Sequence, residues 1–187
     1  KFGKEISEKR LTLIHADILD FLKTEIDKLK AGYKLVANIP YYLTGQIIRR
    51  FLETTNQPQA MILMLQKEVA ARILAKDGKE SILSLSVKSY GVPHYIRSVP
   101  RGAFRPAPGV DSAIVSINEI NRNNFREIDE EIFFELLKRG FASKRKKLAP
   151  KLGLTLATLA VCRIHPNARA EDLALDQWLC LARHQVR

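Results

Sequence analysis

The sequence predicts an α/β fold with a parallel sheet, an antiparallel hairpin at the edge of that sheet, and a small all-α region after it. Between residues 11 and 76, short apolar segments alternate with segments whose apolar residues recur at helical spacing. That alternation is typical of parallel sheets with helices on both faces. Two strand-like runs, 95–99 and 113–117, follow with no helical period between them, and beyond residue 124 only helical periodicity remains.

The first elements are predicted within residues 1–29. Residues 1–10 have the pattern of the end of a helix, and residues 11–16 are apolar and β-prone as far as Asp17. After Asp17 a helix is predicted, because apolar residues recur there at helical intervals. These residues are Ile18, Leu19, Phe21, Leu22, Ile26 and Leu29.

Two further pairs of strand and helix are predicted. Residues 33–37 form a short buried-type strand, and the helix after it is marked by Ile47, Ile48, Phe51 and Leu52. Residues 60–65 form an apolar strand that runs into a helix over 67–76. A sheet of this class normally opens with a glycine-rich turn, and none of the nine glycines is placed to form one. We therefore expect the N-terminal βα units of the sheet to be missing from this chain.

A domain boundary is predicted at residues 121–124, a polar stretch with turn chemistry. Residues 1–120 are expected to form the C-terminal portion of the α/β domain. Residues 121–187 are expected to form a helical domain, with helical patterns around 132–137, 148–159 and 173–181.

Composition and charge narrow the class of protein. The chain is 46% hydrophobic and 27% charged, which is ordinary globular composition. Lys and Arg number 31 against 20 Asp and Glu, and the net charge of +11 favours a polyanionic partner. No apolar run approaches the ~18 residues that cross a bilayer, and the N-terminus lacks the profile of a signal peptide. We expect a cytoplasmic monomer with no membrane partner.

The cysteines and histidines do not indicate a metal site. Cys162 and Cys180 lie outside any Cys-x-x-Cys spacing, and the four histidines have no metal-ligand spacing. We expect both cysteines to be buried thiols, with no disulfide between them.

The strongest local signal is Asn38-Ile39-Pro40-Tyr41 at the end of a predicted strand, where α/β sheets place ligands and catalytic groups. An exocyclic adenine amine is a poor nucleophile because its lone pair is delocalised into the ring. The Asn38 side-chain oxygen and a backbone carbonyl, that of Ile39, can accept its hydrogen bonds and turn the lone pair toward an electrophilic methyl group. Tyr41 offers a ring on which an extruded base can stack. Taken alone, the same residues also suit a plain turn at a strand end.

Two more features point to RNA. The proline-rich segment 104–112 presents Phe104 between the two edge strands, as the second wall of a base pocket or as a simple hairpin connection. Residues 138–151 contain seven basic residues and no acidic one, which favours contact with phosphates over a merely solvated face. The seven are Lys138, Arg139, Lys144, Arg145, Lys146, Lys147 and Lys151.

Through nearly its whole length the sequence resembles the ribosomal small-subunit RNA adenine N6,N6-dimethyltransferases, which are relatives of the macrolide-resistance methyltransferases. Five motifs in order and spacing carry the resemblance. They are Asn38-Ile-Pro-Tyr41, Leu65-Gln-Lys-Glu-Val-Ala70 with Arg72-Ile73, Phe104-x-Pro-x-Pro-x-Val-Asp-Ser112, Phe141-x-x-Lys-Arg-Lys146 and Arg169-Ala-Glu-Asp-Leu173.

The resemblance implies a Rossmann-like fold and S-adenosylmethionine-dependent dimethylation of two adjacent adenosines in a small-subunit rRNA hairpin, within a pre-ribosomal subunit. It implies that Asn38 binds the target amine, that Tyr41 and Phe104 sandwich the adenine, and that Asp17 and Asn38 contact the methyl donor. The family's main donor-binding loop is absent from the sequence, so we expect this polypeptide alone to be inactive.

Other functions are compatible with parts of this pattern. A large-subunit rRNA methyltransferase of the macrolide-resistance type is the nearest, although Val110-Asp111-Ser112 and the Arg169 motif favour the small-subunit enzymes. A DNA adenine methyltransferase fits the C-terminal motifs less well. A non-catalytic RNA-binding assembly or transcription factor with the same fold is also open, and the presence of Asn38, Tyr41 and Phe104 argues against it.

Overall fold

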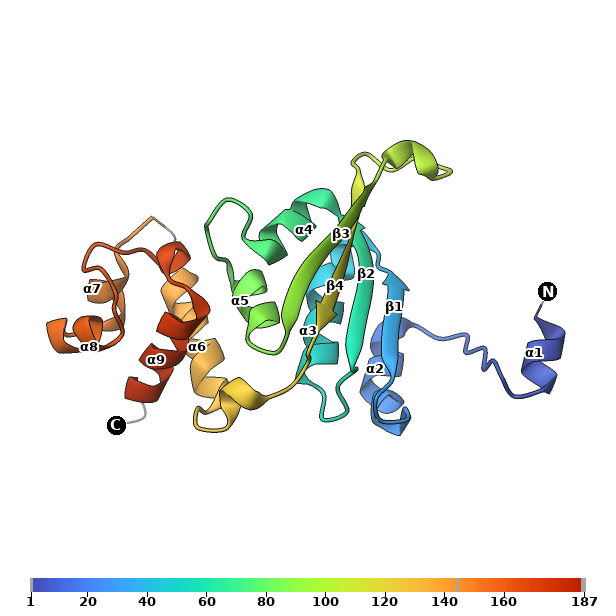
Figure 1. Ribbon diagram of the computed structural model, residues 1–187, viewed down its shortest axis with the longest axis horizontal. Coiled ribbons are helices and arrows are strands. Elements are labelled where there is room, and N and C mark those ends of the chain that lie inside the picture. Colours follow the sequence, from blue (N-terminus) through green and yellow to red (C-terminus); the bar gives the residue numbers. More distant parts are fainter. Residues whose placement is uncertain (1, 144, 186–187) are drawn as a thin grey trace.

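The computed structural model describes residues 2–143 and 145–185 and consists of a sheet with helices packed on it, a linker and a group of helices (Figure 1). The elements of the sheet-containing part are as follows. They are α1 (Gly3–Ser7), α2 (Ile18–Thr24), β1 (Lys34–Asn38), α3 (Thr44–Glu53), β2 (Ala60–Gln66), α4 (Lys67–Leu74), α5 (Ile82–Lys88), β3 (Val92–Val99) and β4 (Ser112–Asn118), with short 3-10 helices at Ile26–Lys28, Tyr41–Leu43 and Arg101–Ala103.

The four strands form one mixed sheet in the order β1-β2-β4-β3. β1 runs parallel to β2, and β4 pairs antiparallel with both β2 and β3. The predicted antiparallel pairing of residues 95–99 with 113–117 is confirmed, with Ser98 opposite Ala113 and an irregularity between Tyr95 and Arg97.

The core lies where α3, α4 and α5 cover one face of the sheet. Met61, Leu63 and Leu65 of β2 are fully buried, and the residues between them are only half-buried. The predicted apolar stripe of α3 is confirmed, since Ile47, Ile48, Phe51 and Leu52 are all buried. Among the described residues we find helices packed closely on this one face, where the sequence predicted cover on both.

Residues 11–16 do not form the strand that their composition predicts. They are extended but unpaired, and Leu13 and Ile14 are 77% and 55% exposed. With α1, this segment lies apart from the sheet (Figure 1). A β-prone run becomes a strand only when a neighbouring strand accepts its backbone hydrogen bonds, and none lies beside it among the described residues.

α5 is a helix that the sequence analysis did not predict. Its N-terminus is fixed by a capping box, in which Ser81 Oγ accepts from the N–H of Ser84 at 3.1 Å and Ser84 Oγ accepts from the N–H of Ser81 at 2.7 Å. The apolar residues of the segment alternate with serines, which masks the helical period.

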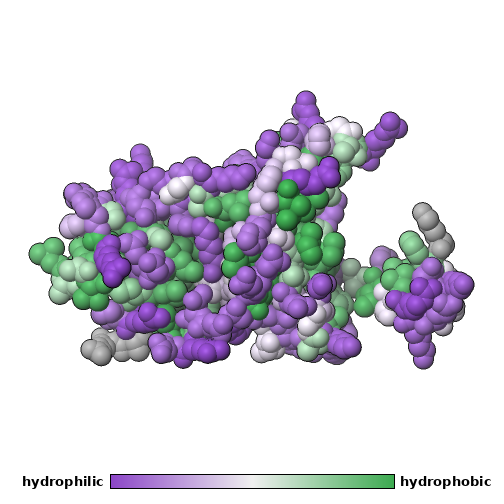
Figure 2. All heavy atoms as spheres, viewed as in Figure 1, coloured by the Kyte–Doolittle hydropathy of each residue, from purple (hydrophilic) through white to green (hydrophobic). Residues whose placement is uncertain are grey.

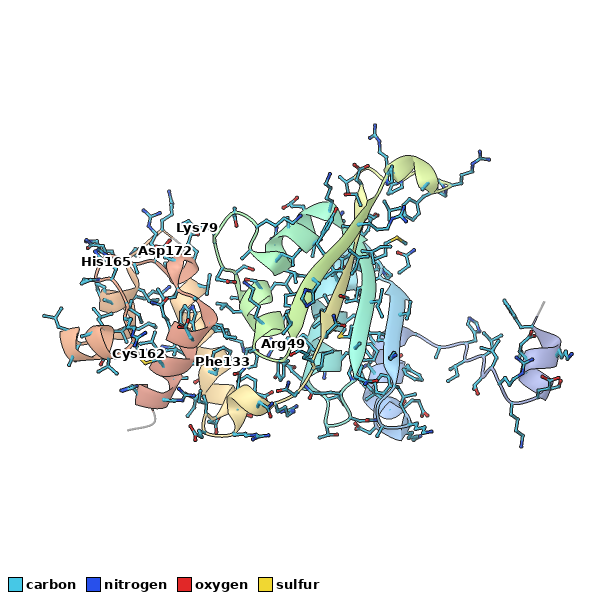
Figure 3. All side chains as sticks on the ribbon, in the orientation of Figure 1. Arg49, Lys79, Phe133, Cys162, His165 and Asp172 are labelled. Carbon is cyan, nitrogen blue, oxygen red and sulfur yellow. A yellow bond between two sulfur atoms is a disulfide. The ribbon has the colours of Figure 1, made fainter. Side chains whose placement is uncertain are left out.

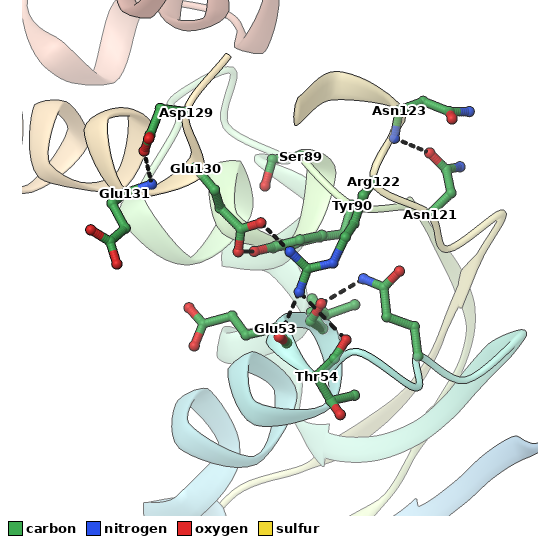
Figure 4. A network of polar contacts seen from close by, with 12 residues as sticks. Glu53, Thr54, Ser89, Tyr90, Asn121, Arg122, Asn123, Asp129, Glu130 and Glu131 are labelled. Atoms are coloured by element: carbon green, nitrogen blue, oxygen red, sulfur yellow. Dashed lines mark hydrogen bonds and ion pairs between the residues drawn. The ribbon is translucent and has the colours of Figure 1, made fainter. Parts of the chain in front are cut away.

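A polar network joins the sheet-containing part to the helices beyond it (Figure 4). The Arg122 guanidinium pairs with Glu130 and donates to the carbonyl of Glu53, at 2.6 Å, at the end of α3. The Tyr90 hydroxyl donates to the same Glu130 carboxylate. Burial, followed by the hydrogen bond to Glu130, raises the pKa of Tyr90. The linker is thus joined to the sheet-containing part by a partly exposed ion pair and a buried tyrosine.

A second contact joins the two parts through the loop after α4. Lys79 forms an ion pair with Asp172, and the two side chains meet across the gap between the parts (Figure 3). The hydrogen bond from Lys79 lowers the pKa of Asp172 below its ordinary value. The backbone contributes as well, since the N–H of Glu80 donates to the carbonyl of Glu171 at 2.8 Å.

The described residues after the linker are helical, with α6 (Glu130–Phe141), α7 (Leu148–Leu152), α8 (Leu156–Val161), a 3-10 turn (Ala170–Asp172) and α9 (Leu175–Gln185). The helical pattern predicted over 148–159 is interrupted at Gly153, whose φ of 67° ends α7 in the left-handed region. Trp178 is fully buried and stacks on Phe141 at 5.7 Å between ring centroids.

The prediction of two free thiols is wrong, because Cys162 and Cys180 form a disulfide with their Cα atoms 5.5 Å apart. Cys162 follows α8 and Cys180 lies within α9. Their separation of 18 residues along the chain gave no indication of contact, since only the fold of the helical part brings the end of α8 beside α9.

The surface carries apolar side chains in two separate regions. Figure 2 shows hydrophobic residues gathered beside β1 and at the α8 end. They include Val36, 74% exposed, on the edge strand β1, and Leu156, 78% exposed, on α8. No helix among the described residues is both long enough and apolar enough to span a membrane.

Candidate active site

The polar residues predicted to carry the chemistry lie at one edge of the sheet. Asn38 is the last residue of β1 and stands opposite Met64 of β2. Two residues further along β2, Gln66 pairs with Ser112, the first residue of β4, which in turn pairs with Val99 at the end of β3. The segment after β1 and the β3–β4 loop therefore leave the sheet at the same edge.

The Asn38 side chain is exposed, and among residues 2–143 and 145–185 its amide has no hydrogen-bond partner. The chain beyond it is held firmly. Ile39 is 2% exposed and its N–H donates to the carbonyl of Met64 at 3.2 Å. The carbonyl of Pro40 accepts from the N–H of Leu43 at 3.0 Å. A fixed backbone thus presents one free amide at the strand end.

Tyr41 is tied across the sheet. Its hydroxyl is 2.8 Å from the hydroxyl of Ser112, which is 1% exposed, so this hydrogen bond is formed away from water. The ring is half-buried, and the next residue, Tyr42, is 87% exposed. The bond to Ser112 fixes the orientation of the Tyr41 ring relative to β4.

Phe104 lies in the loop between β3 and β4 and is half-buried. The loop is pinned at its base, where the N–H of Arg101 donates to the Asp111 carboxylate at 3.0 Å. Among the described residues the rings of Tyr41 and Phe104 do not stack on each other. Two rings that hold a base between them would also be separated in this way. Their role as stacking partners remains a prediction.

Asp17 caps a helix at its predicted position. It precedes α2, and its carboxylate accepts from the N–H of Leu19 at 2.7 Å. Its side chain is exposed, and only one carboxylate oxygen takes part in this bond. The carboxylate therefore remains accessible to a ligand, and no hydrogen bond joins it to Asn38 among the residues described.

The basic segment predicted to contact phosphates begins in the last turn of α6, with Lys138 and Arg139, and ends at Lys151 in α7. Lys138, Arg139, Arg145, Lys146 and Lys147 are exposed, and none has an ion-pair partner within the part of the chain that the structure describes. Lys151 is half-buried and donates to the carbonyl of Gly140 at 3.1 Å, so it supports the α6–α7 turn. Lys144 lies outside the described residues.

Two residues at this edge had no role predicted from the sequence. Ser112 was part of a motif but had no assigned role, and no feature of the sequence indicates its contact with a tyrosine 71 positions away. Tyr42 was also overlooked. Its signal was present, since a second aromatic residue follows Tyr41 directly.

One cluster in the helical part has side chains of the metal-binding type. Ligand atoms of Cys162, Cys180 and His184 lie within 4.8 Å of one another. Both sulfur atoms are joined in the disulfide and offer no thiolate, so the cluster does not fit a metal ion in this state.

Comparison with known proteins identifies relatives over almost the whole chain. A family model described as ribosomal RNA adenine dimethylase matches residues 1–184. Three curated proteins called ribosomal RNA small subunit methyltransferase A are similar to the chain. The one from Dehalococcoides mccartyi is 44% identical over 179 residues, covering 90% of this chain. Those from Mycoplasmopsis pulmonis and Fusobacterium nucleatum are 43% and 38% identical, covering 96% and 92% of the chain.

The chain spans part of the length of these relatives, 62% of the Dehalococcoides protein and 72% of the Mycoplasmopsis protein. Two solved structures share the fold. A dimethyladenosine transferase from Plasmodium falciparum has a TM-score of 0.75 at 23% identity, over 95% of this chain and 74% of that one. The 23S rRNA methyltransferase ErmE has a TM-score of 0.72 at 20% identity, over 100% of this chain and 76% of that one.

Proposed function

This chain belongs to the ribosomal RNA adenine dimethylase family, and we propose that its function is the S-adenosylmethionine-dependent methylation of adenosine N6 in small-subunit rRNA. The expected product is N6,N6-dimethyladenosine at two adjacent adenosines of a hairpin. The names of the curated relatives support the small subunit as the source of the RNA. We place this reaction on an immature ribosomal subunit.

The observation that carries the proposal is the free amide of Asn38 beside a fixed backbone. Asn38 Oδ1 accepts one N–H of the adenine amine. Of the two following carbonyls, that of Pro40 already accepts from Leu43, which leaves that of Ile39 for the second N–H. Two acceptors placed in this way turn the nitrogen lone pair out of conjugation and toward the methyl donor, so that catalysis consists mainly of positioning.

The aromatic residues hold the base. An adenine extruded from the RNA stacks on the Tyr41 ring, whose orientation is fixed by the hydrogen bond to Ser112. Phe104, presented by the β3–β4 loop, covers the other face of the base. These two contacts exclude water from the amine and are tolerant of the sequence around it.

S-adenosylmethionine, when bound, supplies an electrophilic methyl group. Two residues of this chain fit it, since Asp17 has an exposed carboxylate with a free oxygen and Asn38 an exposed amide without a partner. We assign Asp17 to the amino group of the donor's adenine. We assign Asn38 to contact both the methyl donor and the adenine amine that receives the methyl group, at the same edge of the sheet.

Replacement of Asn38 by Ala in the full gene product tests this assignment. Methyl transfer to a small-subunit rRNA hairpin should fall by at least roughly a hundredfold, because a preorganised acceptor is lost. The affinity for the RNA should be unchanged. Asn118→Ala is a matched control, since Asn118 ends β4 at the opposite edge of the sheet.

The reverse pattern is expected for Lys146→Gln combined with Lys147→Gln, where RNA affinity and its salt dependence fall while kcat at saturating RNA is kept. Equal loss of RNA affinity in both variants would contradict this division of labour. Mapping dimethyladenosine in cellular rRNA by mass spectrometry decides the substrate, and product in the large subunit would overturn the choice of small-subunit RNA.

A further inference from the structure

A hollow lies beside the candidate active site. It measures about 540 Å³ and lies between the end of β2 and the base of the β3–β4 loop. Its walls include Gln66, Lys67 and Glu68 from the Leu65–Ala70 motif, and Arg101, Gly109 and Asp111 from the loop. The hollow therefore opens at the sheet edge that carries Asn38 and Tyr41.

The two cations of the hollow are available to an anion. The side chains of Lys67 and Arg101 are exposed, and neither has an ion-pair partner among residues 2–143 and 145–185. The backbones of both residues are fixed by Asp111. The N–H of Lys67 donates to the Asp111 carbonyl at 3.0 Å, and the N–H of Arg101 donates to the Asp111 carboxylate at 3.0 Å. Asp111 thus anchors both cation-bearing segments.

The two carboxylates of the hollow each have a partner within the chain. Glu68 forms an ion pair with Arg72 at 2.9 Å, one turn along α4. One oxygen of Asp111 accepts from the Arg101 backbone, and its other oxygen has no hydrogen-bond partner among the described residues. Lys67 and Arg101 are the cations of the hollow without an ion-pair partner in the described chain, and their chemistry suits a phosphate oxygen.

The hollow is next to the place where the base is expected to stack. Gln66, in its wall, is the sheet partner of Ser112, and the Ser112 hydroxyl is 2.8 Å from that of Tyr41. Asp111 and Ser112 are consecutive residues. A nucleotide whose base lies on Tyr41 thus carries its own phosphates past this hollow, and the RNA backbone is the anion that must be held when a base is extruded.

We propose that Lys67 and Arg101 form a subsite for the RNA phosphodiester that flanks the extruded adenosine. The inference rests on the proposed function and adds to it a specificity-determining contact. Its role is to hold the backbone while the base leaves its stack, so it acts on the bound RNA near the target and not on the RNA as a whole.

The test uses the full gene product and a hairpin RNA in which single linkages are replaced, one at a time, by uncharged methylphosphonates. For the wild type, one neutral linkage next to the target adenosine should raise the Kd and the KM for RNA by roughly tenfold. In the double variant Lys67→Ala/Arg101→Ala, the same neutral linkage should leave the Kd and the KM for RNA unchanged relative to the fully charged hairpin. Arg97→Ala is the matched control, because Arg97 is an exposed cation of β3 outside the hollow.

A second variant adds charge without a folding risk. A Cβ built at Gly109 meets nothing within 4 Å, so Gly109→Lys places a third cation in the hollow and should tighten RNA binding and steepen its salt dependence by about one unit of log–log slope. If the double alanine variant keeps the wild-type sensitivity to every neutral linkage, the subsite is wrong even though methyl transfer is observed. If the wild type binds the hairpin but transfers no methyl group, the proposed function is wrong. The Kd values for the same series of neutral linkages still test the subsite in that case.

Discussion

In the proposed function the side chain of Tyr41 holds an adenine ring, and the orientation of this side chain depends on one hydrogen bond. The hydroxyl of Ser112, its partner, is buried, so removing the phenol leaves a polar group without a partner in a dry environment. Such a loss costs more than the bond itself contributes. Ring and hydroxyl of Tyr41 therefore have separable functions, one in stacking and one in orientation.

Tyr41→Phe separates these functions. The free energy of unfolding should fall by about 1–2 kcal/mol in urea titrations, and methyl transfer should fall less than in Tyr41→Ala, which also loses the ring. The double variant Tyr41→Phe/Ser112→Ala should recover most of the lost stability, because both polar partners are then gone. A single variant as stable as the wild type would show that the hydrogen bond has no structural role.

At the scale of elements, periodicity predicted the strands and helices whose apolar faces are buried, as in β2 and α3. Periodicity failed where the secondary structure of a segment depends on a neighbouring strand or on a single residue. Residues 11–16 have the composition of a strand and no strand beside them, and Gly153 divides one apparent helix into α7 and α8. A signal for that break was present, since Thr155 caps α8 by accepting from Thr158. The strand-end position of Asn38 was likewise predictable, whereas the Tyr41–Ser112 contact joins distant residues and was not.

The break at Gly153 predicts a specific sensitivity to substitution. Gly153→Ala should reduce the free energy of unfolding by about 1 kcal/mol, because its φ of 67° is costly for any residue with a Cβ, although no atom lies within 4 Å of the added group. Gly45→Ala, at an equally open position in α3 with ordinary φ, should be neutral or stabilising. Equal effects of the two substitutions in thermal unfolding would mean that backbone strain does not determine the turn.

At the scale of the molecule, the proposed function requires RNA to contact the sheet edge and the basic segment together, so the orientation of the helical part relative to the sheet matters. Polar contacts at two places help to fix it, the Arg122–Glu130–Tyr90 network and the Lys79–Asp172 ion pair, and the Tyr90 ring also stacks on Phe134 of α6. The domain boundary between residues 120 and 121 remains a prediction. Sequence patterns within each part gave no information on the contacts between the parts. Arg122 carries the larger share, because it also binds carbonyls of Glu53 and Thr54 at 2.6 and 3.4 Å.

Arg122→Ala should therefore weaken the coupling between the two parts. Trp178 is the single tryptophan and lies buried in α9, so its fluorescence reports on the helical part, while far-UV circular dichroism reports on both. In the wild type the two unfolding transitions should coincide. In Arg122→Ala stability should fall by about 2 kcal/mol, since Glu130 and two carbonyls lose a charged donor, and the transitions should separate. Arg126→Ala, an exposed linker arginine, should leave them coincident. Coincident transitions at unchanged stability in Arg122→Ala would contradict a coupling role for Arg122 and assign the coupling to the other contacts between the parts.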